Sequence, residues 1–406
     1  MKPSEYILSN LRGLFPEACH DRVFPVGGCV RDLLLKREVR DIDLVAMVSD
    51  DLLRSLRFRP VTGKTTAPIW FRHDAAFGVI EVTQLAADAV LVDELRRRDF
   101  TINALAATLA GDFIDPLHGR DDLLRGILRA CSPRVFSDDP LRIFRAFRFE
   151  AEGWRMEEVT EALIRERDWS EDFRTIPMER FSREMCKSMA ALDPARFFRL
   201  MLDFAVGEEY LPEIFLMPDI PAGPPAHHPE GDLFTHSVQV LERVAATTHE
   251  LLPRFCGFFH DIGKLSTPPE SYPRHYDHDE AGFARARDFC VRLRLPAAFR
   301  TALSWISRLH GKANRWDELR PATKVRMAGD AIKSGITAIL PSVSAADKMD
   351  GYGMPGWEDA VRTAGMTTAE LGIDQERLAA MPVAHRPAFI LHKRVEMLRS
   401  MSLTGE

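Results

Sequence analysis

The change of hydrophobic pattern along the chain constrains its fold most. Residues 21–115 mix short β-type runs, namely VFPV, DIDLVAM, FGVIEVT and FIDP, with helical stretches. Residues 122–215 instead carry long amphipathic patterns rich in Arg, Glu, Leu and Phe. The mixture in the first segment is typical of a small domain that contains both strands and helices. The apolar positions of the second segment recur at helical spacing, which indicates helices. The sequence therefore predicts an α+β protein, with a small mixed-sheet head at residues 1–125 and an all-helical neck at residues 126–216.

A proline-rich segment follows the predicted neck. Residues 217–232, MPDIPAGPPAHHPEGD, contain five prolines and two glycines, which is typical of a linker. Eight of the thirteen histidines lie between His227 and His310, so the composition changes at this point. We therefore expect an all-helical domain at residues 233–355 and a C-terminal helical segment at residues 356–406. A chain of 406 residues has room for about two or three domains.

The bulk composition excludes several classes of protein. Hydrophobic residues make up 46% and charged residues 28%, as in ordinary soluble proteins. There is no run of about eighteen uncharged apolar residues, so no membrane span is expected. The first residues lack the apolar core of a signal peptide, which favours a cytoplasmic protein. The six cysteines are scattered without a CxxC pair, which argues against a zinc ribbon or a disulfide scaffold.

The net charge of −6 gives no hint of nucleic-acid binding, so any RNA contact requires a local basic surface. One candidate lies between residues 117 and 148. It contains seven arginines: Arg120, Arg125, Arg129, Arg134, Arg142, Arg145 and Arg148. A solvated helical face is an equally good interpretation of these arginines taken alone.

The first chemical motif is a glycine pair followed by two aspartates. Gly27 and Gly28 precede Arg31, and Asp41 and Asp43 follow ten residues later, separated by one isoleucine. In a strand, residues two apart face the same side, and paired carboxylates are oxygen ligands suited to Mg²⁺. The glycines allow the backbone to approach a triphosphate, and Arg31 adds a charged hydrogen bond. Such a pair alone is weak evidence, because most lie in loops or cap helices.

A second motif is Arg97-Arg98-Asp99-Phe100-Thr101-Ile102-Asn103. Asp99 or Thr101 could cap a helix formed by the apolar run INALAATLA that follows. The other interpretation is compatible with this one: Arg98 and Asn103 could hold the phosphates and the ribose of a nucleotide.

A third motif, Asp139-Pro140-Leu141-Arg142, predicts a helix start with Asp139 as the N-cap. Asp139 and Arg142 are three residues apart, so an ion pair on one helical face is the simple interpretation. The chemistry of nucleobases offers another. Cytosine and adenine each present an amine donor beside a ring-nitrogen acceptor, which a carboxylate and a guanidinium can match. Uracil and guanine would leave buried charged groups unpaired.

Together these motifs resemble those of class II CCA-adding enzymes, which share the head of poly(A) polymerases. The order and rough spacing match over about residues 22–190 in the segments 27–32, 41–43, 97–104, 115–123, 138–142 and 176–184. The resemblance implies a template-independent nucleotidyltransferase that adds C and A residues to tRNA 3′ ends from CTP and ATP. It implies that Asp41 and Asp43 bind the catalytic Mg²⁺. It further implies a nucleotide site of Gly28, Arg31, Arg98, Asp139, Arg142, Arg145 and Arg148.

Two positions depart from the family pattern. Asp138 stands where the family's motif has glutamate, which is a conservative change. Only fifteen residues, 84–98, separate the strand ending at Thr83 from Asp99, fewer than in most CCA-adding members. Members restricted to adding CC resemble this shortened form. Addition of CC, addition of complete CCA, and poly(A) synthesis therefore all stay open.

The C-terminal half contains the pattern His236, His260-Asp261 and Asp347. An adjacent His-Asp pair in an apolar helix is costly to bury unless it is ligated or paired, so these residues predict a site for a divalent cation. Imidazole ligands favour Ni²⁺, Mn²⁺ or Zn²⁺ over Ca²⁺. The segment resembles HD-superfamily phosphohydrolases fused to some CCA-adding enzymes, which implies 2′,3′-cyclic phosphodiesterase and phosphatase activity.

Three further histidines, His275, His278 and His310, could complete a second metal site, bind phosphate, or simply lie at the surface of the cleft. Two other classes of function stay open beside the bifunctional enzyme. One is a non-catalytic RNA-binding protein, against which the intact motifs argue. The other is an HD-type hydrolase whose head only senses nucleotides.

Overall fold

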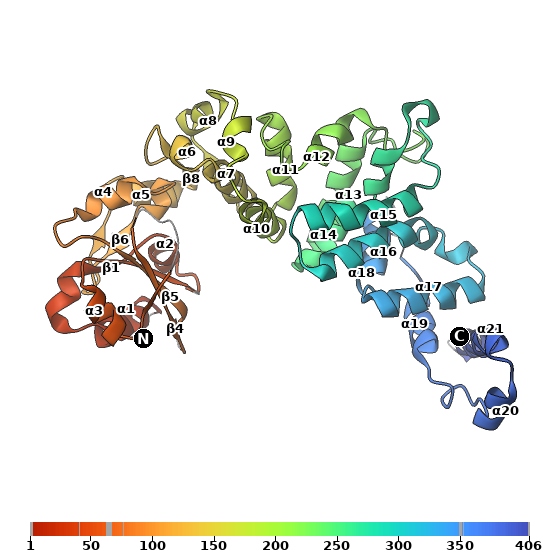
Figure 1. Ribbon diagram of the computed structural model, residues 1–406. Helices are drawn as coiled ribbons and strands as arrows, with labels where there is room; N and C mark the ends of the chain where they lie inside the picture. The colour runs from red at the N-terminus through yellow and green to blue at the C-terminus, as the bar shows by residue number, and fades with distance from the viewer. Residues whose placement is uncertain are drawn as a thin grey trace. The chain divides into compact units, whose positions relative to one another are not determined.

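The computed structural model describes residues 3–39, 41–61, 67–75, 77–348, 351 and 353–404, with the side chains of residues 6–401 among them. The chain forms two compact units, residues 1–169 and residues 170–406. In Figure 1 the first runs from red to yellow and the second from yellow to blue. The boundary falls within the stretch 126–216 that the sequence predicts as one helical neck. The described elements confirm the predicted α+β fold, with a mixed sheet in the head and helices beyond it.

The head is built on a mixed sheet of strand order β1-β2-β5-β4-β3. Strand β2 is antiparallel to β1 and parallel to β5, and β4 is antiparallel to both β5 and β3. The bounds are β1 Val23–Pro25, β2 Ile42–Ala46, β3 Arg59–Pro60, β4 Ile69–Asp74 and β5 Gly78–Gln84. Two strand pairs accompany it: β6 Ala106–Ala107 with β7 Phe113–Ile114, and β8 Ile127–Leu128 with β9 Arg155–Met156.

Helices flank this sheet and continue to the end of the first unit. They are α1 Pro3–Leu14, η1 Glu17–Arg22, α2 Gly28–Leu34, α3 Asp50–Ser55, α4 Leu91–Arg96, η2 Thr101–Asn103, α5 Gly119–Arg125, α6 Val135–Asp138, α7 Leu141–Ala151 and α8 Glu158–Arg165. A core cluster of the head joins apolar residues of α1 and of the sheet, including Leu11, Leu44, Trp70 and Val82. This core fixes β2 and β5, whose polar residues form the first candidate site.

One local prediction is wrong. The run INALAATLA, residues 102–110, does not form a helix: a single 3-10 turn ends at Asn103, and Ala106 and Ala107 form strand β6. Pairing of β6 with β7, and the hydrogen bond from the Gly27 amide to the Leu105 carbonyl at 2.9 Å, satisfy this backbone in extended form. Tertiary pairing here overrides the intrinsic helix preference of alanine.

The second unit is helical in its described part. Its elements are α9 Ser170–Phe173, α10 Met178–Met189, α11 Pro194–Asp203, α12 Pro212–Leu216, η3 Met217–Asp219, α13 Leu233–Thr247, α14 Leu251–Phe259, η4 Ile262–Ser266, η5 Pro269–Ser271, α15 His278–Arg292, α16 Ala297–Ala313, η6 Trp316–Glu318, α17 Pro321–Ser334, α18 Ile339–Asp347, α19 Trp357–Gly365, α20 Gln375–Ala380, η7 Val383–His385 and α21 Arg386–Thr404. Within this unit, α13, α14, α16 and α18 pack together (Figure 1).

The segment expected to be a linker, residues 217–232, lies inside the second unit. Its ends are paired, because the Leu233 amide donates to the Ile220 carbonyl at 2.8 Å and the Ala222 amide donates to the Gly231 carbonyl at 2.9 Å. Among the described residues, no helix is both long and apolar enough to cross a membrane.

Candidate functional sites

The two predicted aspartates of the head lie at the start of the central parallel strand pair. Asp41 immediately precedes β2, and Asp43 is its second residue. Asp43 lies opposite Glu81 of β5 in the parallel register. Burial raises the pKa of Asp43 and the nearby Asp41 raises it further, while Arg98 opposes the shift. Burial, Asp43 and Asp41 likewise raise the pKa of Glu81. These mutual effects place the three carboxylates near one another, and carboxylate oxygens are ligands that Mg²⁺ accepts.

Glu81 was missed by sequence reasoning. It belongs to the run FGVIEVT, where it is a single acid in an otherwise apolar strand. The residue type alone predicts a solvent-facing position, and Glu81 is indeed exposed. Only the parallel pairing of β2 with β5 places it beside Asp43.

Arg98 brings positive charge to these acids. Its Nε is buried and has no hydrogen-bond partner among the described residues, which suits an anionic ligand. The guanidinium lies so close to Gly27 that a Cβ at that position would overlap it. Gly27 also has a φ of 70°, in the left-handed region that favours glycine. The backbone conformation therefore favours glycine at this position, and a side chain there would displace the guanidinium of Arg98.

A network of buried polar groups joins the second motif to the third. Asp99 is 6% exposed, and its Oδ2 accepts hydrogen bonds from Arg145 at 2.8 and 2.5 Å. Its Oδ1 accepts from Asn103 at 2.9 Å, and Asn103 in turn accepts from Arg31 at 2.7 Å. Burial by itself would raise the pKa of Asp99, but Arg145, Asn103 and the Phe100 amide together lower it below the usual range. The network fixes α7 against the loop that carries Arg98.

Helix α7 presents the residues expected to read the base. Asp139 accepts a hydrogen bond from the Leu141 amide at 3.2 Å, but the N-cap of α7 is Pro140, so the predicted N-cap at Asp139 is wrong by one residue. Arg142 donates to the Arg97 carbonyl at 2.9 Å and to the Val135 carbonyl at 3.3 Å. Arg142 thus lies beside the loop of Arg98. Arg148 is 8% exposed, forms an ion pair with Glu152, and lies over the Phe149 ring.

The four residues of the second predicted constellation converge in the helical unit. His236 lies on α13, His260 and Asp261 directly follow α14, and Asp347 is the last residue of α18. The His236 Nε2 lies 3.0 Å from Asp347 Oδ1 and 3.4 Å from the His260 Nε2. His236, His260 and Asp261 are 2% exposed or less. The donor atoms of His236, His260 and Asp261 lie within 4.8 Å of one another, close enough to hold one cation, and Asp347 forms a similar group with His260 and His310.

Two of the three additional histidines extend this cluster. His278 and His310 place their Nε2 atoms 3.5 and 3.1 Å from Asp261 Oδ1, and 3.4 Å from each other. Asp261, His278 and His310 form a second group that could hold a cation, so Asp261 belongs to both groups. His275 does not join them, because its Nε2 is hydrogen-bonded to the Pro221 carbonyl at 2.7 Å and its Nδ1 to Thr267 at 2.9 Å.

Backbone carbonyls orient three of the four converging imidazoles. The Nδ1 atoms of His260, His278 and His310 lie 2.8, 2.7 and 2.8 Å from the carbonyl oxygens of Gly257, His275 and Ser307. A carbonyl can only accept, so each Nδ1 carries the proton and each Nε2 lone pair is left for a cation. Asp261 Oδ1 is buried without a hydrogen bond among the described residues. The donors present therefore fit divalent cations.

The charges of the cluster favour a bound cation. Burial would lower the pKa of His260, but Asp261 and Asp347 raise it to about 10. The metal-free site therefore takes up a proton where a metal could bind. Lys264 lies 2.6 Å from Asp261 Oδ2 and donates to the Ala222 carbonyl at 2.6 Å. Asn314 donates to Asp347 at 2.5 Å.

A pocket of about 600 Å³ opens over the cluster. Its wall contains His236, Asp261, His278, His310 and Asp347, and also the basic residues Arg243, Arg315 and Lys348. Acidic and imidazole groups on the floor with cations on the rim suit a phosphate ester. Close packing fixes the floor: a Cβ at Gly263 would overlap the His278 carbonyl, so only glycine lets η4 approach α15 this closely.

Known proteins resemble both parts of the chain. Residues 23–129 match the family described as the poly A polymerase head domain, and residues 233–350 match the HD domain. Proteins named multifunctional CCA protein from Methylococcus capsulatus and Laribacter hongkongensis are 34% and 35% identical over 365 and 352 residues, covering 83% of this chain and 83% and 86% of theirs.

Solved structures show the same fold. The Bacillus stearothermophilus CCA-adding enzyme in complex with CTP aligns with a TM-score of 0.62 at 22% identity, covering 94% of this chain and 86% of that one. The Thermotoga maritima CCA-adding enzyme complexed with tRNA aligns with a TM-score of 0.62 at 21% identity, covering 100% and 97%. A poly A polymerase head joined to an HD domain defines a class of two-domain enzymes. Within it, the chain belongs to the multifunctional CCA protein family.

Proposed function

We propose that this chain adds C and A residues to the 3′ end of tRNA from CTP and ATP, without a nucleic-acid template, and hydrolyses phosphate esters at its HD domain. The observation that carries the first activity is the parallel register that sets Asp43 beside Glu81, with Asp41 and Arg98 near both. The names of the relatives support tRNA as the acceptor. Cytoplasmic location, expected from the sequence, belongs to the same proposal.

In the head, Asp41, Asp43 and Glu81 are proposed as oxygen ligands of Mg²⁺. Such ions, when bound, activate the attacking hydroxyl and neutralise the leaving pyrophosphate. Arg98, with its buried Nε unpartnered among the described residues, would hold the triphosphate. Gly28, at the start of α2, and Arg31 would complete the triphosphate site.

Base selection is assigned to the start of α7. Asp139 would accept from the exocyclic amine of cytosine or adenine, and Arg142 would donate to the ring nitrogen. Asn103, Arg145 and Arg148 are also predicted to belong to the nucleotide site. Because Asn103 and Arg145 bond to Asp99 and Arg148 bonds to Glu152, we assign them the task of holding α7 and Arg31 in place.

At the HD domain, His236, His260, Asp261 and Asp347 are proposed to hold one divalent transition ion, Ni²⁺, Mn²⁺ or Zn²⁺. Asp261, His278 and His310 would hold a second. The metal supplies an activated water for hydrolysis. Lys264 and the basic rim would neutralise the phosphate of a 2′,3′-cyclic or terminal ester. We also propose that the head covers residues 1–125, the helical neck residues 126–216 and the HD domain residues 233–355.

Incubation with labelled CTP or ATP, Mg²⁺ and tRNA lacking its 3′ end tests the first activity, and sequencing the extended ends defines it. We expect ends that finish in CCA. Ends that stop at CC would support the second candidate, a CC-adding enzyme, which the short segment 84–98 favours. Long A tails would identify a poly(A) polymerase. No incorporation together with retained phosphatase activity would refute the proposal for the head.

A further inference from the structure

The proline-rich segment 217–232 forms part of the wall of the hydrolytic pocket. Lys264 and His275 fix it from the side of the HD cluster, through hydrogen bonds to the carbonyls of Ala222 and Pro221 at 2.6 and 2.7 Å. Its residues His227, His228 and Glu230 line the pocket beside His236. The segment is therefore held by residues that follow Asp261 and precede His278 closely in the chain.

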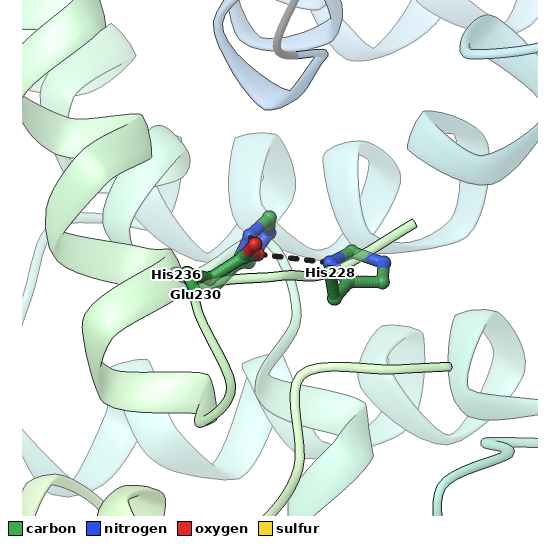
Figure 2. A group of neighbouring side chains, drawn as sticks. All are labelled: His228, Glu230 and His236. Atoms are coloured by element: carbon green, nitrogen blue, oxygen red, sulfur yellow. Dashed lines mark hydrogen bonds and ion pairs between the residues drawn. The ribbon is translucent and has the colours of Figure 1, made fainter. Parts of the chain in front are cut away.

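Glu230 is the charged group of this segment that contacts the cluster. Its side chain is 6% exposed, and its Oε1 accepts from His236 Nδ1 at 2.7 Å and from His228 Nδ1 at 2.9 Å (Figure 2). An ionised carboxylate can only accept, so both Nδ1 atoms carry protons. The His236 Nε2 lone pair is thereby directed at Asp347 and His260. The other converging imidazoles rely on neutral carbonyls for this purpose, whereas His236 has a carboxylate.

His228 is held between this carboxylate and the backbone. Its ring lies against Gly223, where a Cβ would overlap the ring atoms. The ring also packs edge-on against His236, with the ring centroids 5.0 Å apart. His228 has thus a fixed place in the pocket wall, although it lies outside both groups that contain Asp261.

We propose that Glu230 is a positioning residue of the hydrolytic site, which fixes His236 in the tautomer that binds a cation and holds His228 in the wall that a phosphate ester contacts. This inference rests on the proposed HD function. A carboxylate behind a ligating histidine raises the basicity of the ligand, and its loss typically costs about 10- to 100-fold in metal affinity or activity.

An alternative use of the same residues is a separate cation site formed by His228, Glu230 and His236, whose donor atoms lie within 4.8 Å of one another. The short hydrogen bond from His236 Nδ1 to Glu230 argues against it, because that nitrogen cannot donate to Glu230 and ligate a cation at once. The two arrangements differ in the number of cations that depend on Glu230.

The test measures Mn²⁺ binding to the full-length protein by calorimetry, together with hydrolysis of bis(p-nitrophenyl) phosphate and incorporation of CMP. We expect Glu230→Gln to weaken Mn²⁺ binding about 10-fold and Glu230→Ala about 100-fold, with unchanged stoichiometry. His228→Ala should leave Mn²⁺ affinity within about 2-fold and raise KM. Glu242→Gln is the matched control, since Glu242 lies on the same helix as His236 but pairs with Arg199.

Unchanged Mn²⁺ affinity in Glu230→Ala would overturn the positioning role. Loss of one equivalent of Mn²⁺, with the remaining affinity intact, would overturn it in favour of direct ligation. Retained CMP incorporation shows that the head folds, and unchanged helical content by circular dichroism shows that the second unit folds. The conservative Glu230→Gln repeats the test without the cavity of alanine. Failure of the wild-type protein to bind Mn²⁺ or to hydrolyse the ester would instead refute the proposed function of the HD domain.

Discussion

Arg145 gives the sharpest test of whether the residues on α7 contact the nucleotide or hold the helix in place. Its guanidinium donates twice to Asp99, which is 6% exposed, while the Arg145 side chain is 31% exposed. Arg145→Met removes the charge and keeps most of the aliphatic stem. Removing one partner of a buried ion pair costs about 3–5 kcal/mol. We expect about 3 kcal/mol, the lower end, because Asn103 and the Phe100 amide still donate to Asp99.

The reverse substitution is milder. In Asp99→Asn the guanidinium of Arg145 can turn to water, so we expect a loss of about 1–2 kcal/mol. The double variant should recover part of the loss, with a coupling energy of about 2 kcal/mol. Hydrogen–deuterium exchange of the full chain, read in peptides covering residues 95–104 and 141–151, measures these local free energies. Global unfolding is less suitable, because the transitions of the two units would overlap.

The stability that the Arg145–Asp99 ion pair contributes should fall in acid. The folded-state pKa of Asp99 is lowered, so the pair contributes its full stability above the unfolded pKa of about 3.9 and loses it as the pH falls through the folded value. The difference in protection between wild type and Arg145→Met should therefore shrink in acid. If Arg145→Met kept wild-type protection at neutral pH but bound CTP more than about 10-fold more weakly, Arg145 would be a nucleotide contact and our assignment would be refuted.

The other predictions concern the two sites separately. Asp41→Ala should abolish CMP incorporation and spare ester hydrolysis, whereas Asp261→Ala should do the reverse; loss of both activities in either variant would contradict two independent sites. Gly27→Ala should lower incorporation at least about 10-fold, because the new Cβ displaces Arg98 and the backbone has a φ of 70°. Gly13→Ala is the control, since Gly13 has open space around it. Gly263→Ala should destabilise the second unit by about 1–3 kcal/mol and weaken Mn²⁺ binding, since η4 must move from α15; wild-type melting and Mn²⁺ affinity would disprove that packing argument.

The motifs of the chain were readable from the sequence because each is local. The glycine pair, the alternating aspartates, the Arg-Arg-Asp run and the adjacent His260 and Asp261 all lie within a few residues, where strand and helix periodicity fix which side chains share a face. The strands at VFPV, DIDLVAM, FGVIEVT and FIDP were predicted in the same way and are confirmed as β1, β2, β5 and β7. The α+β class and the family followed from the order of these segments.

Long-range pairing decided the rest. Glu81 became part of the head site only through the parallel register of β5 with β2, which no local pattern encodes. Ala106 and Ala107 left their predicted helix because a neighbouring strand offered hydrogen bonds. The proline-rich segment read as a linker from its composition, yet buried contacts at Ala222 and Pro221 hold it against the HD cluster and bring Glu230 to His236. The sequence determined which chemical groups were present, and tertiary packing determined which of them met, because a contact between distant residues depends on the whole fold.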